Sequence, residues 1–159
     1  MMFETLTPPN ARSDDARKRA MNALALAPRG FLKERFAGFA NDVPMAMPVR
    51  GPEVGLIMLR GRAGGGGAAF NLGEASVCRA TVRLATGEVG HAMILGRDAE
   101  TAGIAAHLDA LWQTDAWRNR IEAEVVTPAL AADAKARERR AEETEATRVD
   151  FFTVARGED

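Results

Sequence analysis

The stretch that decides the fold is Arg60–Asp98, RGRAGGGGAAFNLGEASVCRATVRLATGEVGHAMILGRD. Apolar and polar residues alternate from Val77 to Leu84, and this period of two is typical of a half-buried β-strand. Thr86-Gly87 is a two-residue turn signal, so the chain is expected to return as a second, antiparallel strand. We therefore predict a β-hairpin over about residues 77–95.

A two-residue turn fixes which residues of the hairpin face each other. It predicts one apolar face with the pairs Leu84–Val89, Val82–His91, Ala80–Met93 and Cys78–Leu95. The other face then carries Arg79, Thr81 and Arg83 opposite Ile94, Ala92 and Gly90. In this register His91 and Cys78 face the core. The arginine face is shared with apolar residues, so we expect a partner to cover it.

Two helices and two strand segments are expected before the hairpin. Ser13 or Asp14 is a suitable cap for a first helix ending near Ala27, and residues 31–40 predict a second one, which gives an N-terminal helical hairpin. Met45–Val49 is expected to be a short edge strand. Val54–Arg62 has apolar residues on both faces, which is typical of a central strand covered on both sides.

Helices are also expected after the hairpin. Asp98 is a good N-cap for a helix to about Thr114, and a shorter helical segment should cover 115–126. A charged, alanine-rich helix over 129–147 has no broad apolar stripe, so it should lie in solvent or against a partner. The last residues, RVDFFTVARGED, predict a terminal strand or a docking tail.

The predicted fold class is therefore α+β, with an antiparallel sheet around the hairpin and helices packed on it or extending from it. We expect a disordered leader over residues 1–12 and a single domain over 13–159. Within that domain, residues 129–159 are expected to extend as a partner-docking helix and strand.

Composition argues against several classes of function. The 159 residues carry a formal net charge of −1, so any anion recognition must be local. Cys78 is the single cysteine, which excludes an internal disulfide and a Cys-x-x-Cys site. The sequence holds no nucleophile motif, no pair of catalytic carboxylates and no zinc ligand set, so we predict no catalytic residue and no metal ligand.

The glycine run and the arginines are the candidate contact residues. Gly64–Gly67 could present amide groups to a phosphate, but no Lys-Ser/Thr or helix start follows, which favours a flexible or partner-fitted loop. Arg79 and Arg83 lie about 13 Å apart on one strand face. With Arg62 and Arg97 nearby in sequence, they form an anion site, a subunit interface or an ordinary solvated face.

A second class of function remains open at the N-terminus. The two helices carry cations that would serve as phosphate contacts in a helix-turn-helix, namely Arg17, Lys18, Arg19, Arg29, Lys33 and Arg35. The alternative is therefore a small nucleic-acid-binding or regulatory protein. Neither helix shows a set of base-reading side chains, and the near-neutral net charge argues against this alternative.

Three segments resemble a known family in order and spacing: GRAGGGGAAFNLGEASVCRATVRL, GEVGHAMILGRD with its following LDALWQ helix, and RVDFFTVARGED. They are similar to the PhnG family, the G subunit of the carbon–phosphorus lyase core complex. The resemblance covers about Val54–Trp112 and the last dozen residues. The chain departs from the family pattern where Gly66 replaces a threonine and Cys78 precedes Arg79 in place of a threonine. Both changes remove hydroxyls that a phosphate could contact.

The resemblance implies a required, non-catalytic subunit of a cytoplasmic bacterial complex that degrades organophosphonates. The I subunit is the expected direct partner, with H, J and K in the core complex and L acting functionally, and with no nucleic acid or membrane partner. A phosphonate would displace adenine from ATP to give an alpha-D-ribose 1-phosphonate 5-triphosphate. ATP and phosphonate are substrates of the complex, and no cofactor is expected on this chain.

The family resemblance and the candidate residues together give two versions of the role. The chain either only forms interfaces, or also contributes contacts to the triphosphate or phosphonate, and alone it is expected to self-associate. The expected ligand or interface contacts are Arg62, Gly64, Gly65, Gly67, Arg79, Arg83, Arg97, Phe151, Phe152 and Arg156.

Overall fold

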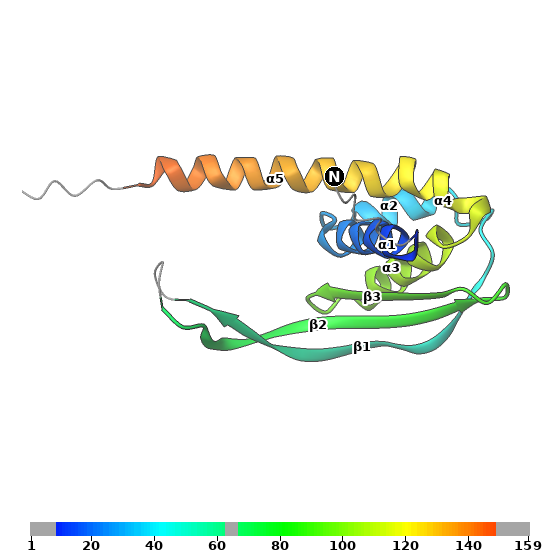
Figure 1. Ribbon diagram of the computed structural model, residues 1–159, viewed down its shortest axis with the longest axis horizontal. Coiled ribbons are helices and arrows are strands. Elements are labelled where there is room, and N and C mark those ends of the chain that lie inside the picture. The colour runs from blue at the N-terminus through cyan, green and yellow to red at the C-terminus, as the bar shows by residue number, and fades with distance from the viewer. Residues whose placement is uncertain (1–8, 63–66, 149–159) are drawn as a thin grey trace, which may run out of the picture.

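The computed structural model describes residues 9–62 and 67–148, and in them a layer of strands is covered on one face by helices (Figure 1). The strands are β1 (Ala46–Gly61), β2 (Phe70–Leu84) and β3 (Val89–Leu95), antiparallel and in the order β1-β2-β3. The predicted α+β class is therefore confirmed. The predicted terminal strand lies outside the described residues, and the division into leader, domain and extension stays a prediction.

The helices are stacked outwards from the sheet. They are α1 (Pro9–Leu26), α2 (Phe31–Ala37), α3 (Ala99–Trp112), α4 (Asp115–Ile121), the π-helical turn η1 (Glu122–Val126) and α5 (Thr127–Ala146). The helix α3 packs on the strands, α1 and α2 each pack against α3, and α5 packs on α1. Figure 1 shows α5 as a long rod that continues past the other helices. The helix α1 begins at Pro9, earlier than the predicted cap at Ser13 or Asp14.

The core lies between the strands and α3. The apolar face predicted for β2 is confirmed, because its alternate residues Cys78, Ala80, Val82 and Leu84 are all buried. The helix α3 meets them with small and branched side chains, among them Ala102, Ala105, Ala106, Leu108 and Leu111. The start of α3 is also as predicted: Asp98 is the N-cap, and its side chain accepts a hydrogen bond from the Thr101 amide at 3.0 Å.

The hairpin register differs from the prediction by one residue. The observed pairs are Val82 with Gly90, Thr81 with His91, and Arg79 with Met93. The reason is the loop: the Leu84 amide donates to the Glu88 carbonyl, so the loop has three residues and ends at Gly87 with φ 110°. The slip reverses both faces of β3, so the prediction that His91 faces the core was wrong. Gly90, Ala92 and Ile94 face the helices instead.

The prediction that Val54–Arg62 is a covered central strand was also wrong. It forms one strand with residues 46–53, and this strand is an edge of the sheet. Its pairing with β2 shifts register near Pro48–Glu53 and again at Leu59. Gly73 lies inside β2 at the second shift, with φ 151°.

Beyond the helices, β1 and β2 continue as a two-stranded ribbon, residues 56–61 and 70–76, which we call the arm. Figure 1 shows it projecting in the same direction as the far half of α5.

Candidate functional site

Arg79 and Arg83 lie on the outer face of the sheet, the face turned away from the helices. They alternate on β2 with the buried residues Cys78, Ala80 and Val82, so their side chains point to the opposite side. Arg79 contacts Glu53 of β1, with Nη2 3.2 Å from Oε1, and Arg50 donates to the same oxygen at 2.8 Å. The structure therefore places two arginines, the predicted Arg79 and its neighbour Arg50, against one carboxylate on this face.

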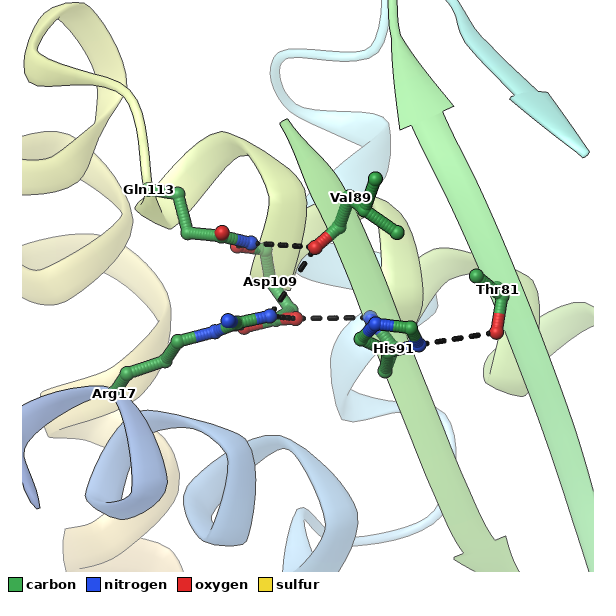
Figure 2. Close-up of polar contacts among 6 residues, drawn as sticks. All are labelled: Arg17, Thr81, Val89, His91, Asp109 and Gln113. Atoms are coloured by element: carbon green, nitrogen blue, oxygen red, sulfur yellow. Dashed lines mark hydrogen bonds and ion pairs between the residues drawn. The ribbon is translucent and has the colours of Figure 1, made fainter. Parts of the chain in front are cut away.

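His91 belongs to this outer face, because of the corrected register. Its ring Nδ1 is 3.1 Å from the Thr81 hydroxyl oxygen, and both residues are at least partly exposed. Figure 2 shows the imidazole of β3 lying beside Thr81 of β2. A hydroxyl paired with Nδ1 leaves Nε2 of the ring available to solvent or to a ligand.

The remaining predicted contact residues are not brought to this face. Arg62 and Arg97 are exposed just beyond the ends of β1 and β3, and Gly67 is exposed before β2. Arg97 lies four residues along the chain from Met93, the partner of Arg79. The other candidates lie outside the described residues: Gly64, Gly65, Phe151, Phe152 and Arg156.

Large exposed apolar side chains are concentrated on the strands. Apart from Leu26 and Met45, every large hydrophobic residue found exposed in the described part of the chain lies on β1, β2 or β3. On the arm, the exposed fraction is 63% for Leu56, 54% for Met58 and 59% for Leu72. Leu56 and Met58 share the face of buried Cys78, but no helix covers this part of the ribbon.

On the helix side of the sheet, a buried carboxylate that the sequence analysis did not predict joins α1, α3 and β3. Asp109 of α3 is 1% exposed and accepts hydrogen bonds from Arg17 Nε at 3.1 Å, Arg17 Nη2 at 2.8 Å and the His91 amide at 2.9 Å (Figure 2). Arg17 and Gln113 also donate to the Val89 carbonyl, at 3.2 and 2.8 Å. The hydrogen bond that Arg17 donates to Asp109 raises the pKa of Arg17 above its ordinary value. All these polar atoms are satisfied, which is typical of a structural network.

Several of the cations proposed as nucleic-acid contacts bind other residues of the same chain. Arg17 pairs with Asp109, Arg19 pairs with Glu122, and Lys33 contacts Asp98 at 3.2 Å and Glu100 at 2.7 Å. Arg35 lies over the Phe31 ring, 5.2 Å from its centroid. These contacts leave few of the six cations free for a phosphate backbone, so no observation favours the nucleic-acid alternative.

Two structural facts about the described residues bear on the kind of site. No group of three or more His, Cys, Asp or Glu side chains there is placed to hold a metal ion. Among the same residues, no helix has the length and hydropathy needed to cross a bilayer. The features that remain on this part of the chain are the outer arginine face and the apolar arm.

Comparison with known proteins agrees with the segments singled out in the sequence. The family model described as phosphonate metabolism protein PhnG matches residues 15–157. A protein of Rhizobium meliloti (strain 1021), named alpha-D-ribose 1-methylphosphonate 5-triphosphate synthase subunit PhnG, is 54% identical over 151 residues. That alignment covers 92% of this chain and 96% of the relative. The chain belongs to the PhnG family of phosphonate metabolism proteins.

Proposed function

We propose that this chain is a required but non-catalytic subunit of the bacterial carbon–phosphorus lyase system, acting in the cytoplasm in phosphonate catabolism. In this role it supports the I subunit while a phosphonate displaces adenine from ATP. The product would be an alpha-D-ribose 1-phosphonate 5-triphosphate. Membership of the PhnG family and the printed name of the relative, a synthase subunit, support this proposal.

The observation that carries the proposal is the apolar arm. A two-stranded ribbon is marginally stable in water without a layer to cover it. This ribbon exposes Leu56, Met58, Phe70 and Leu72, all at least 48% accessible. Several large exposed apolar residues on one projecting ribbon are typical of a protein interface. The arm therefore has the character of a segment that becomes buried when the chain joins a larger assembly.

We assign the direct contact to the I subunit, with H, J and K in the same core complex and L acting functionally. ATP and the phosphonate are bound by the complex, and this chain is proposed to bring no cofactor of its own. The chain in isolation would then leave the arm uncovered, and self-association through the arm is the expected consequence.

Co-expression with the I subunit tests the proposal. The wild-type chain is expected to co-purify with the I subunit, and a double variant Leu56→Glu, Met58→Glu is expected to lose this association because two charges would be buried at the contact. Leu26→Glu is the matched control, since Leu26 is also a leucine that is more than half exposed, 52%, on α1. Failure of the wild-type chain to associate, or equal loss in the Leu26 control, would count against the arm as the docking segment.

The non-catalytic part of the proposal has its own test. Adenine release by the reconstituted synthase should require this chain. It should persist in Cys78→Ala and His107→Gln, which remove the buried thiol and the half-buried imidazole. Loss of turnover in either variant within an intact complex would assign chemistry to this chain.

A further inference from the structure

The outer face of the sheet holds a cluster of hydrogen-bond donors drawn from all three strands. Thr81 lies at its centre, paired with Arg50 of β1 on one side and with His91 of β3 on the other. Arg79 and Arg83 lie two residues to either side of Thr81 on β2. We call Arg50, Arg79, Thr81, Arg83 and His91 the outer cationic patch.

The patch has an excess of positive charge. Arg50 and Arg79 both contact the same oxygen of Glu53, at 2.8 and 3.2 Å, so a single carboxylate serves two guanidinium groups. Arg83 has no carboxylate partner among the residues that the structure describes. Three arginines against one glutamate leave a charge of +2 with His91 neutral. A chain whose net charge is −1 therefore presents a local cationic surface.

The spacing of the donors suits an elongated anion. The Cα atoms of Arg79 and Arg83 are about 13 Å apart along β2, and the Cα atom of His91 lies about 5 Å across the sheet from that of Thr81. The Thr81 hydroxyl occupies Nδ1 of His91, at 3.1 Å, so the ring is fixed with Nε2 available. Guanidinium groups at each end and an imidazole donor between them match a row of phosphoryl oxygens.

Apolar residues border the patch on the neighbouring strands. Met47 and Val89 are the strand neighbours of Arg83, and Met93 is the neighbour of Arg79. Met47 and Met93 are more than half exposed. A partner surface resting on this border would lower the dielectric around the arginines and strengthen their hold on an anion.

The geometry points to the outer cationic patch as a binding site for a linear polyphosphate, namely the triphosphate chain of the nucleotide or of the ribosyl product. The choice of this anion rests on the proposed function, because the relative is named for a 5-triphosphate product. Arg79 and Arg83 bind the two ends of the chain, and His91 donates to its middle. Glu53 pairs with Arg50 and Arg79 in the absence of the anion and competes with it for them.

Titration with inorganic tripolyphosphate tests this site on the full chain, alone and in complex with the I subunit. Saturable binding at 0.15 M salt is expected, with amide chemical-shift changes at Thr81 and His91, and binding should weaken as salt rises. Arg79→Ala and Arg83→Ala should each weaken binding by about tenfold, since hydrogen bonds to charged groups contribute at least that factor. Arg139→Ala on α5 is the matched control, an exposed arginine outside the patch, and should bind as the wild type does.

A second variant separates a binding site from a merely structural one. Glu53→Gln removes the negative charge that competes with the anion, so tripolyphosphate should bind more tightly than to the wild-type chain. Weaker or unchanged binding in Glu53→Gln, or an equal loss in Arg139→Ala, would overturn the assignment. Thermal unfolding of each variant verifies that the fold is retained.

The alternative occupant is an acidic surface of a partner protein. If wild-type chain and complex bind no tripolyphosphate, while Arg79→Ala with Arg83→Ala breaks co-purification with the I subunit, the patch is a protein interface and the triphosphate site is refuted. In that outcome the proposed subunit function stands. If tripolyphosphate binds but the wild-type chain never associates with the I subunit, the subunit function fails and the anion site stands.

Discussion

Arg17 of α1 and Asp109 of α3 form an ion pair with Nη2 2.8 Å from Oδ2, at the edge of the sheet that β3 forms (Figure 2). Asp109 also accepts the amide of His91, and Arg17 donates to the carbonyl of Val89. These are backbone groups that lack a strand partner on that side, since β3 pairs with β2 alone in the described sheet. The pair therefore closes the edge of β3 and fixes two helices against it.

Removing the Asp109 carboxylate should lower the free energy of unfolding. Asp109→Ala leaves Arg17 and the His91 amide without their acceptor in a largely buried position, and we expect a loss of about 3–5 kcal/mol in the free energy of unfolding. Equilibrium urea unfolding measures it. Glu124→Ala, which breaks the exposed Arg120–Glu124 pair, is the matched control and should cost under about 1 kcal/mol. A loss below 1 kcal/mol in Asp109→Ala would show that the network does not hold the helices.

Gly90 is required by the close crossing of β3 and α3. A Cβ at this position would lie 1.9 Å from the Ala106 carbonyl oxygen and 2.6 Å from the Ala110 nitrogen, both backbone atoms. Gly90→Ala should therefore destabilise the protein by at least about 3 kcal/mol, at the upper end of overpacking costs. Gly103→Ala on the same helix has space and should be neutral or stabilising by up to about 1 kcal/mol. Similar melting temperatures for the two variants would contradict the observed packing.

The N-cap of α3 gives a prediction for acid conditions. Hydrogen bonds from the Thr101 amide and hydroxyl, and then from Lys33, lower the pKa of Asp98 from 3.8 to about 2. A carboxylate with a depressed folded-state pKa stabilises the fold above its unfolded pKa, and this contribution is lost as pH falls from near 4 to about 2. The wild type should exceed Asp98→Asn in stability at pH 6 and match it near pH 2. A difference that is constant over this range would contradict the assignment.

His107 gives a prediction for how stability changes with pH near neutral pH. Burial lowers its pKa below 6.5, although Nε2 lies 2.8 Å from the Pro44 carbonyl, a contact that favours the charged ring. Because the unfolded chain takes up the proton first, stability should fall as pH drops from about 7 through 6.5 and below. Urea unfolding at pH 7.5 and 5.5 should show a smaller pH effect in His107→Gln than in the wild type. An equal pH effect would remove His107 as its source.

The sequence predicted those parts of the fold that rest on local patterns. Alternation identified the buried face of β2, and a single residue type identified the Asp98 cap, because both depend on residues close together in the chain. The hairpin register was missed because Thr86-Gly87 indicates a two-residue turn, whereas the loop has three residues. The true register depends on Gly90, whose missing side chain admits α3, and this contact is not visible in a hydrophobic pattern.

The candidate site was predicted only in part, because some of its residues lie close together in the chain and others do not. Arg79 and Arg83 were assigned to one strand face from alternation alone. Arg50 and His91 join them only through the β1–β2 and β2–β3 registers, and Glu53 through a side-chain contact. Asp109 was overlooked because its partner Arg17 lies 92 residues away in sequence. The apolar residues of β1 were correctly seen on both faces, but a partner-covered edge and a covered central strand have the same pattern.

Hydrogen–deuterium exchange on the chain with and without the I subunit tests the central claim most directly. The account predicts that the complex slows exchange in the arm, residues 56–61 and 70–76, while peptides from the buried helix α3 exchange alike in both states. Unchanged exchange in the arm within a stable complex would contradict the claim that this ribbon is the docking segment.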